Sequence, residues 1–223
     1  MRMICLICIL YSQMFFAKEY SLEECKDLAK SVVGKIPGWC NAKKAEAMMD
    51  LVFEVKPNTC VELGVYNGAS LFPTALALKH LKFGIVYAID AWDSQEAVRY
   101  YPKEGPHRGW WEGQDLNKHY RSCLSVIGEY GLGPYCVVLR QTFANALEQV
   151  PCIDILHIDA THTNEGDFID VVPYARKVKK DGYIWFDGWA NSNDTYEHLK
   201  KTCLVEKVIN SGTCILLHKI IEE

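Results

Sequence analysis

The sequence predicts an α/β fold, a doubly wound and mostly parallel seven-stranded sheet with an antiparallel C-terminal hairpin. Short apolar runs with β character alternate with helical patterns, which favours parallel strands joined by helices. A glycine-rich turn connects the first run to the helix after it. The last two runs are separated only by Asn210-Ser211-Gly212, and so short a connection forces those strands to be antiparallel. With 223 residues, of which 49% are apolar, the chain can form one large core.

The helices and strands follow in chain order. Ser21 to Glu24 has the form of a capping box, and Asn41 caps a second helix that runs to about Val55. We predict strands at 60–63, 85–90, 136–140, 153–158, 183–186, 204–209 and 213–218. Helices are predicted at 68–81, from after residue 113 to about 130, at 143–149, around 168–178 and before the hairpin. The segment 93–113 is predicted to be irregular. The chain therefore divides into an N-terminal apolar segment (1–20), N-terminal helices (21–58) and an α/β domain (59–223).

The turn after the first strand is the most informative stretch of the chain. Its strand carries an acid, Glu62, and the turn contains Gly64 and Gly68. A dinucleotide fingerprint needs a third glycine between these two, so that a pyrophosphate can touch the backbone. Tyr66 stands at that place, which disfavours a nicotinamide dehydrogenase. A side chain is tolerable there if the ligand carries no phosphate, and S-adenosylmethionine (SAM) carries none.

Polar residues end the predicted strands of this sheet. In doubly wound sheets, ligands lie across the carboxyl ends of the strands. The informative positions are therefore Glu62, Asp90, Gln141, Asp159 and Asp187. By contrast, Asp154 begins a strand and is predicted to be structural, and His157 is predicted to be a hydrogen-bonded core histidine.

With these residues in place, the chain resembles class I SAM-dependent methyltransferases, above all a bacterial group associated with glycan and antibiotic biosynthesis. The resemblance runs from about Thr59 to the C-terminus. Three segments carry it: residues 62–70, residues 86–92 with the downstream pair Trp110-Trp111, and residues 154–166 with 181–187. It implies a transfer of the methyl group of SAM to an acceptor, most often an oxygen of a sugar or small metabolite. A non-catalytic protein that uses this fold to bind a ligand or partner is the alternative.

The resemblance also implies cofactor contacts. It places the turn around the methionine part of SAM, the end of the second strand at the ribose, the end of the third strand near the adenine and the end of the fourth near the sulfonium. The residues so implied are Glu62, Gly64, Tyr66, Asn67, Gly68, Ser70, Asp90, Ala91, Trp92, Gln141, Thr142 and Asp159.

The expected catalytic group is Asp159, His162 and Asp187. An alcohol acceptor must lose a proton, and two mechanisms are open. In metal-dependent relatives, acids at the positions of Asp159 and Asp187 hold Mg²⁺ or another divalent cation, which can polarise the acceptor oxygen. Alternatively, His162 takes the proton directly. We favour the metal slightly, although Ala160-Thr161 and Gly188 depart from the pattern of the metal users.

The aromatic segment from Tyr100 to Trp111 has two interpretations of equal weight. It is either a lid over the acceptor, because aromatic faces suit sugar rings and flat substrates, or a packed loop or dimer contact. We therefore expect a small molecule or a glycan as the acceptor. The second interpretation also allows the protein to form a homodimer.

Composition restricts the remaining choices. A net charge of −4 and a pI near 6.0 argue against nucleic-acid partners. No apolar stretch is long enough to span a membrane. Four of the 10 cysteines, Cys60, Cys136, Cys152 and Cys214, lie in or beside apolar β-runs, so we expect reduced core thiols and a cytoplasmic protein. Residues 1–17 resemble a signal peptide weakly, because Phe15 stands where a small residue is expected.

Overall fold

The structure is a computed structural model that describes residues 20–209 and 213–222. The signal-peptide-like segment and the turn of the C-terminal hairpin lie outside the described residues. The strands are β1 Thr59–Leu63, β2 Ile85–Asp90, β3 Cys136–Arg140, β4 Ile153–Ile158, β5 Val178–Asp187, β6 Cys203–Ile209 and β7 Cys214–Lys219. The helices are α1 Leu22–Val33, α2 Ala42–Val55, α3 Leu71–Leu81, α4 Ser94–Ala97, α5 Pro106–Glu112, α6 Leu116–Glu129, α7 Phe143–Ala146, α8 Asn164–Lys177 and α9 Asn193–Leu199.

The seven strands form one sheet in the order β3-β2-β1-β4-β5-β7-β6. The first five strands are parallel, and β7 is antiparallel to both β5 and β6. The predicted fold class is thus confirmed. The strand order reverses between β1 and β4, which makes the carboxyl ends of these two strands the switch point where ligands bind in such sheets.

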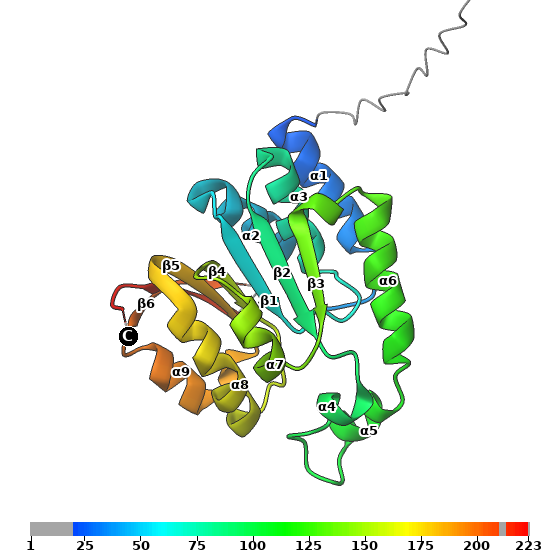
Figure 1. The fold of residues 1–223 in the computed structure, drawn as a ribbon, viewed down its shortest axis with the longest axis vertical. Helices are drawn as coiled ribbons and strands as arrows, with labels where there is room; N and C mark the ends of the chain where they lie inside the picture. Colours follow the sequence, from blue (N-terminus) through cyan, green and yellow to red (C-terminus); the bar gives the residue numbers. More distant parts are fainter. Residues whose placement is uncertain (1–19, 210–212, 223) are drawn as a thin grey trace, which may run out of the picture.

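Helices cover both faces of the sheet (Figure 1). On one face, β-strand residues such as Cys60 and Val86 share an apolar core with helices α1, α2, α3 and α6. On the other face, residues such as Val61 and Leu156 pack with α7, α8 and α9. Neighbouring strand residues point to opposite faces, so both faces of the parallel strands are apolar and buried. The N-terminal helices α1 and α2 therefore belong to the apolar core on one face of the sheet.

Two local predictions were wrong. The segment 93–113 is not irregular throughout, because it contains α4 and α5, which lie beyond the carboxyl ends of β2 and β3 (Figure 1). Asp93 starts α4 by accepting hydrogen bonds from the N–H groups of Gln95 and Glu96. Strand β5 begins at Val178 and not at Tyr183, since the expected turn at Asp181 is a left-handed irregularity within the strand. Within the described residues, no helix is both long and apolar enough to cross a membrane.

Candidate active site

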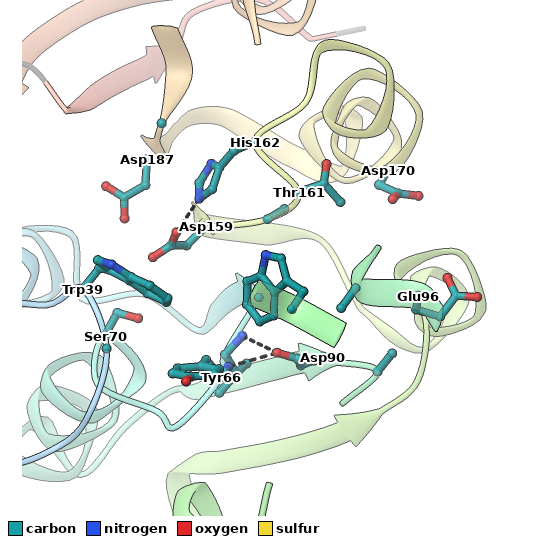
Figure 2. Close-up of a pocket in the computed structure, with 18 of the residues that line it drawn as sticks. Trp39, Tyr66, Ser70, Asp90, Glu96, Asp159, Thr161, His162, Asp170 and Asp187 are labelled. Carbon is teal, nitrogen blue, oxygen red and sulfur yellow. Dashed lines mark hydrogen bonds and ion pairs between the residues drawn. The ribbon is translucent and has the colours of Figure 1, made fainter. Parts of the chain in front are cut away.

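A cavity of about 730 Å³ opens at the carboxyl edge of the sheet, around the switch point. Its volume lies within the range of roughly 300–1,000 Å³ that is usual for small-molecule sites. The wall includes the loop before α2 and Lys44 in the first turn of that helix, the turn after β1, the α4–α5 segment, the start of α7, a residue of α8 and the ends of β2, β4 and β5. Figure 2 shows several of these residues around the cavity.

The turn after β1 is fixed by contacts across the switch point. Gly64 has a φ of +83°, and a Cβ on it would lie 2.0 Å from the carbonyl oxygen of Asp159, so only glycine allows the two strand ends to approach. The N–H of Asp159 in turn donates to the carbonyl of Leu63 at 2.9 Å. The glycine therefore positions Asp159 as well as the turn.

Asp90 ends β2 and holds the same turn. Its Oδ2 accepts hydrogen bonds from the N–H groups of Val65 and Tyr66 at 3.0 and 2.9 Å, and its Oδ1 accepts one from Trp92 at 2.7 Å. Tyr66 has a φ of +52°, which is unusual for a residue with a side chain, and the bond from its N–H helps to hold it there. Asp90 lines the cavity while it fixes the backbone beside it.

The ends of β4 and β5 bring two carboxylates, from Asp159 and Asp187, to one corner of the cavity (Figure 2). A buried lysine from α2 joins them. Lys44 Nζ is hydrogen-bonded to Asp187 Oδ2 and lies 3.5 Å from Asp159 Oδ2. Only 1% of Lys44 is exposed. Burial alone would lower the pKa of Lys44, but the charges of Asp159 and Asp187 outweigh it and hold the pKa above its usual value.

His157 lies behind this corner, inside β4, and is a buried, hydrogen-bonded histidine as predicted. Its Nε2 lies 2.9 Å from Asp187 Oδ2, and its Nδ1 lies 3.5 Å from Glu62 Oε2. Burial and the charge of Lys44 lower the pKa of His157, whereas the bonds to Asp187 and Glu62 raise it, to about 9 in sum. Burial raises the pKa of Asp187, but His157 and Lys44 outweigh it and hold the pKa far below its usual value.

His162 contacts the corner from the loop after β4. Its Nε2 lies 3.0 Å from Asp159 Oδ1, so the protonated nitrogen donates to the carboxylate. The other ring nitrogen, Nδ1, is buried and has no hydrogen-bond partner among the described residues; it packs against Gly188, where a Cβ would approach it to 2.3 Å. Gly188 has a φ of +65° and leaves room for the ring. The cavity is therefore faced by the Asp159–His162 pair and not by a free imidazole nitrogen.

Aromatic side chains form the opposite wall. The centroid of the Trp39 ring lies 5.5 Å from that of Tyr66 and 5.6 Å from that of Trp110, and the ring centroids of Trp110 and Trp111 are 4.8 Å apart. Trp110 and Trp111 belong to α5, so the 93–113 segment does line the cavity. This arrangement favours the lid interpretation over a loop that only packs on the sheet edge.

The wall is rich in acids. Of the residues that the structure describes, six carboxylates line the cavity against two permanently charged cations, Lys44 and Arg99; the acids are Asp90, Asp93, Glu96, Asp159, Asp170 and Asp187. Burial raises the pKa of Asp170 to about 6, and Arg99 offsets this only in part. A cation-rich ligand suits this wall. SAM carries a sulfonium and an ammonium against one carboxylate and no phosphate, so the residues fit it.

Ten of the predicted site residues line the cavity: Gly64, Tyr66, Asn67, Ser70, Asp90, Ala91, Thr142, Asp159, His162 and Asp187. Four others do not line it: Glu62, Gly68, Trp92 and Gln141. Glu62 is 1% exposed and accepts a hydrogen bond from Ser70 Oγ at 2.6 Å, so it supports the turn from behind. Trp92 is buried as well, and its Nε1 donates to the carbonyl of Tyr66 at 2.8 Å.

Trp39 and Lys44 are two of the wall residues that were not predicted from the sequence. Both precede β1 and lie outside the segment that carries the motifs. A signal was available for Lys44, because it stands one helical turn before Met48, on the apolar and buried side of α2. A charged residue on such a stripe needs a buried partner.

The donor set also tests the expected metal ion. His157, Asp159 and Asp187 can each offer one ligand atom, and these atoms lie within 4.8 Å of one another. However, the ammonium of Lys44 is bonded to Asp187 and close to Asp159, where a cation shared by the two acids would lie. A divalent ion would be repelled by it, so the residues as arranged do not fit a metal ion.

Comparison with known proteins agrees with this geometry. The methyltransferase-domain family matches residues 61–189, more than half of the chain. No curated protein matches the chain in sequence. Similar solved structures include an O-methyltransferase from Bacillus cereus in complex with S-adenosylhomocysteine (14% identity, TM-score 0.59, covering 88% of this chain and 90% of that chain). They also include TomG from Streptomyces achromogenes in complex with SAM (14%, 0.58, 92% and 92%) and the O-methyltransferase NovP (14%, 0.66, 90% and 98%).

At such low identity these structures show the fold. The family match goes further, and the chain belongs to this methyltransferase family. The resemblance of its motifs to class I SAM-dependent methyltransferases is confirmed, and the protein is a SAM-dependent methyltransferase.

Proposed function

We propose that the cavity binds SAM beside Asp90 and that the methyl group is transferred to a hydroxyl oxygen of an acceptor held between the aromatic wall and Asp159. The observation that carries this proposal is the meeting of two carboxylates, from Asp159 and Asp187, with an aromatic wall at the switch point of the sheet. The names of the similar structures, which include O-methyltransferases, support oxygen as the acceptor atom.

When bound, SAM supplies an electrophilic methyl group: a bond forms between the acceptor oxygen and the methyl carbon while the sulfur–methyl bond breaks, which releases S-adenosylhomocysteine. The chain must orient the acceptor, exclude water and take the hydroxyl proton. Asp159 is the proton acceptor in this proposal, because its carboxylate lines the cavity. His162 holds that carboxylate through its Nε2 and is a positioning residue.

The alternative in which Asp159 and Asp187 hold Mg²⁺ remains a prediction that a chelator tests directly. It is supported by the donor set of His157, Asp159 and Asp187. It is opposed by the position of Lys44, so no step of the proposed mechanism passes through a metal ion.

The walls also restrict the acceptor. Flat aromatic faces accommodate a sugar face or an aromatic ring, and the surplus of carboxylates repels phosphates and other anions. We therefore propose an uncharged acceptor with a ring and a hydroxyl group, either a glycan or a small metabolite. The aromatic residues of α5 that line the cavity, Trp110 and Trp111, support this choice.

The experiment is a release assay for S-adenosylhomocysteine with purified protein, SAM and paired acceptors that differ only in a phosphate group. We expect turnover with neutral phenols or sugars and not with their phosphate esters. Asp159→Asn should lower turnover by roughly 10²–10⁴-fold, as expected for loss of a general base, while SAM still binds. Protein that binds SAM but methylates no acceptor would favour the non-catalytic alternative.

We further propose that the protein works in the cytoplasm, where SAM is made. The eight described cysteines are all free thiols, which supports a reducing compartment. Cys60, Cys136 and Cys214 are buried as predicted, but Cys152 is exposed, because it precedes β4 and lies outside the core. Thiol titration of rapidly quenched cells tests the proposal, and quantitative disulfide formation would contradict it.

A further inference from the structure

Lys44 reaches the active site from a part of the chain that the methyl-transfer motifs do not include. It lies in the first turn of α2, whose N-cap residue Asn41 accepts a hydrogen bond from the Lys44 N–H at 2.9 Å. Helix α2 packs against α1 and α3 on one face of the sheet. The start of the helix is thereby fixed at the carboxyl edge, and the side chain extends to the ends of β4 and β5.

The side chain is built into a charged network. Lys44 is almost fully buried, and a buried ammonium is costly unless carboxylates surround it. Asp187 and Asp159 do so, and His157 holds Asp187 from behind. An ammonium has three N–H donors, and among the described residues these two carboxylates are its hydrogen-bond partners. Since Lys44 also lines the cavity, one donor is left for a ligand.

We propose that the ammonium of Lys44 is the resident cation of this active site, occupying the place between two carboxylates that a divalent metal ion would take, so that methyl transfer needs no metal. The inference rests on the proposed O-methyl transfer. In that reaction, the free N–H of Lys44 donates to the acceptor oxygen and stabilises the negative charge that grows on it as Asp159 removes the proton.

Lysine suits this role because its ammonium is a compact point charge on a flexible stem. It combines the charge of a cation with a position fixed by the fold. Asp187 then has a different task from Asp159: it holds the ammonium and does not take the proton. A lysine that only stabilised the fold would leave the metal-binding and kinetic properties of the site independent of its charge.

The first test measures Mn²⁺ binding by electron paramagnetic resonance, without SAM or acceptor. Wild-type protein should leave Mn²⁺ free, because the ammonium repels it. Lys44→Ala removes the charge and opens space beside three ligand groups, so this variant should bind Mn²⁺, and a second substitution, Asp187→Asn, should abolish that binding. Lys43→Ala is the matched control, since Lys43 is the exposed neighbour on the same helix, and it should behave as wild type.

The second test uses turnover. Chelator should leave the wild-type rate unchanged, and Lys44→Met, which keeps the volume but not the charge, should lower it by roughly 10²–10³-fold, as loss of one transition-state donor does. Mg²⁺ or Mn²⁺ should restore part of the activity of Lys44→Ala and none of that of Lys44→Met, which leaves no room for an ion.

The outcomes separate clearly. Mn²⁺ binding to the wild type that Asp187→Asn abolishes would overturn the proposal, and so would a folded Lys44→Ala variant that leaves Mn²⁺ free. If Lys44→Ala is unstable alone, its unfolding temperature should rise with Mn²⁺, because an ion that binds the folded state stabilises it; no rise would count against the proposal. Failure of the proposed O-methyl transfer would appear as absent S-adenosylhomocysteine with hydroxyl acceptors and would leave the Mn²⁺ result unchanged.

Discussion

The two halves of the active-site edge are built in different ways. At the ends of β1 and β2, the carboxylate of Asp90 is bonded to backbone N–H groups 24 and 25 positions away, within one strand–helix–strand unit. At the ends of β4 and β5, Asp159 and Asp187 are bonded to a lysine 115 and 143 positions away. The carboxylate of the cofactor half is thus held within one strand–helix–strand unit, whereas the two carboxylates of the acceptor half are held by a side chain from a distant part of the chain.

This difference has energetic consequences. Backbone N–H groups are neutral donors, and the loss of their carboxylate leaves groups that water or a ligand can satisfy. The acceptor half contains buried charges, which are costly if one partner is removed. Substitutions in the acceptor half should therefore affect both folding and turnover, and those in the cofactor half should affect mainly SAM binding.

The largest expected effect is on stability, from Asp187→Ala. This substitution leaves Lys44 and His157 buried without their shared carboxylate, and breaking a buried pair in this way costs about 3–5 kcal/mol of unfolding free energy. Urea unfolding followed by circular dichroism measures it. Glu148→Ala, at an exposed acid away from the site, is the control and should change little.

A double substitution sharpens this result. Lys44→Met combined with Asp187→Ala removes both members of the pair, so it should destabilise the protein less than the sum of the two single substitutions. Strictly additive effects would show that the two charges are not coupled, and the contrast between the two halves would lose its physical basis.

The same contrast explains what the sequence predicted. The alternation of strands and helices, the ends of β1, β2 and β4 and the turn at Gly64 are determined by local patterns, and most of the residues chosen there line the cavity. Glu62 was expected to contact the cofactor, but it lies behind the cavity wall. Side chains alternate between the two faces of a strand, and the sequence does not show that Ser70 and His157 would lie beside the carboxylate oxygens of Glu62.

The acceptor half could be predicted only in part. Asp159, His162 and Asp187 were identified because they follow strands, but their partners depend on how α2 packs on the sheet. The sequence predicted the helix itself, from its cap at Asn41 to about Val55, but not where the side chain of Lys44 would end. The helices within 93–113 were missed for a related reason, since α4 and α5 are too short to show a periodic pattern.

The next effect concerns pH and the buried His157. Its pKa is raised to about 9 in the folded protein, against about 6.5 in an unfolded chain. Protonation therefore stabilises the fold fully below pH 6.5, and this contribution is lost as pH rises through about 9. We expect a loss on the order of 3 kcal/mol over this interval. Urea unfolding at several pH values should show it in the wild type and not in His157→Asn; equal pH profiles would refute it.

In the cofactor half, Asp90→Ala should weaken SAM binding by on the order of 2 kcal/mol, about 30-fold, because it removes a carboxylate from the cavity and frees the turn. Isothermal calorimetry measures this. Asp154→Ala is a matched control, since Asp154 also accepts hydrogen bonds from two backbone N–H groups, those of Asn58 and Thr59, but at the opposite edge of the sheet. That variant should bind SAM as wild type does, and equal affinity in all three proteins would remove Asp90 from the cofactor site.

The smallest effect expected is that of His162→Ala, and it distinguishes a positioning residue from a base. If His162 only holds Asp159, the substitution removes one hydrogen bond to a carboxylate and should lower turnover about tenfold, which corresponds to roughly 1.4 kcal/mol. SAM affinity should not change, and His162→Gln, which can still donate to Asp159, should recover part of the loss.

If the imidazole is the base, turnover should fall roughly 10²–10⁴-fold in both variants. The wild-type rate should then also fall as pH drops through the pKa of His162, which lies above its usual value because the bond to Asp159 outweighs the effect of burial. Since Nδ1 packs against Gly188 and Nε2 is bonded to Asp159, we expect the smaller effect and partial recovery with glutamine.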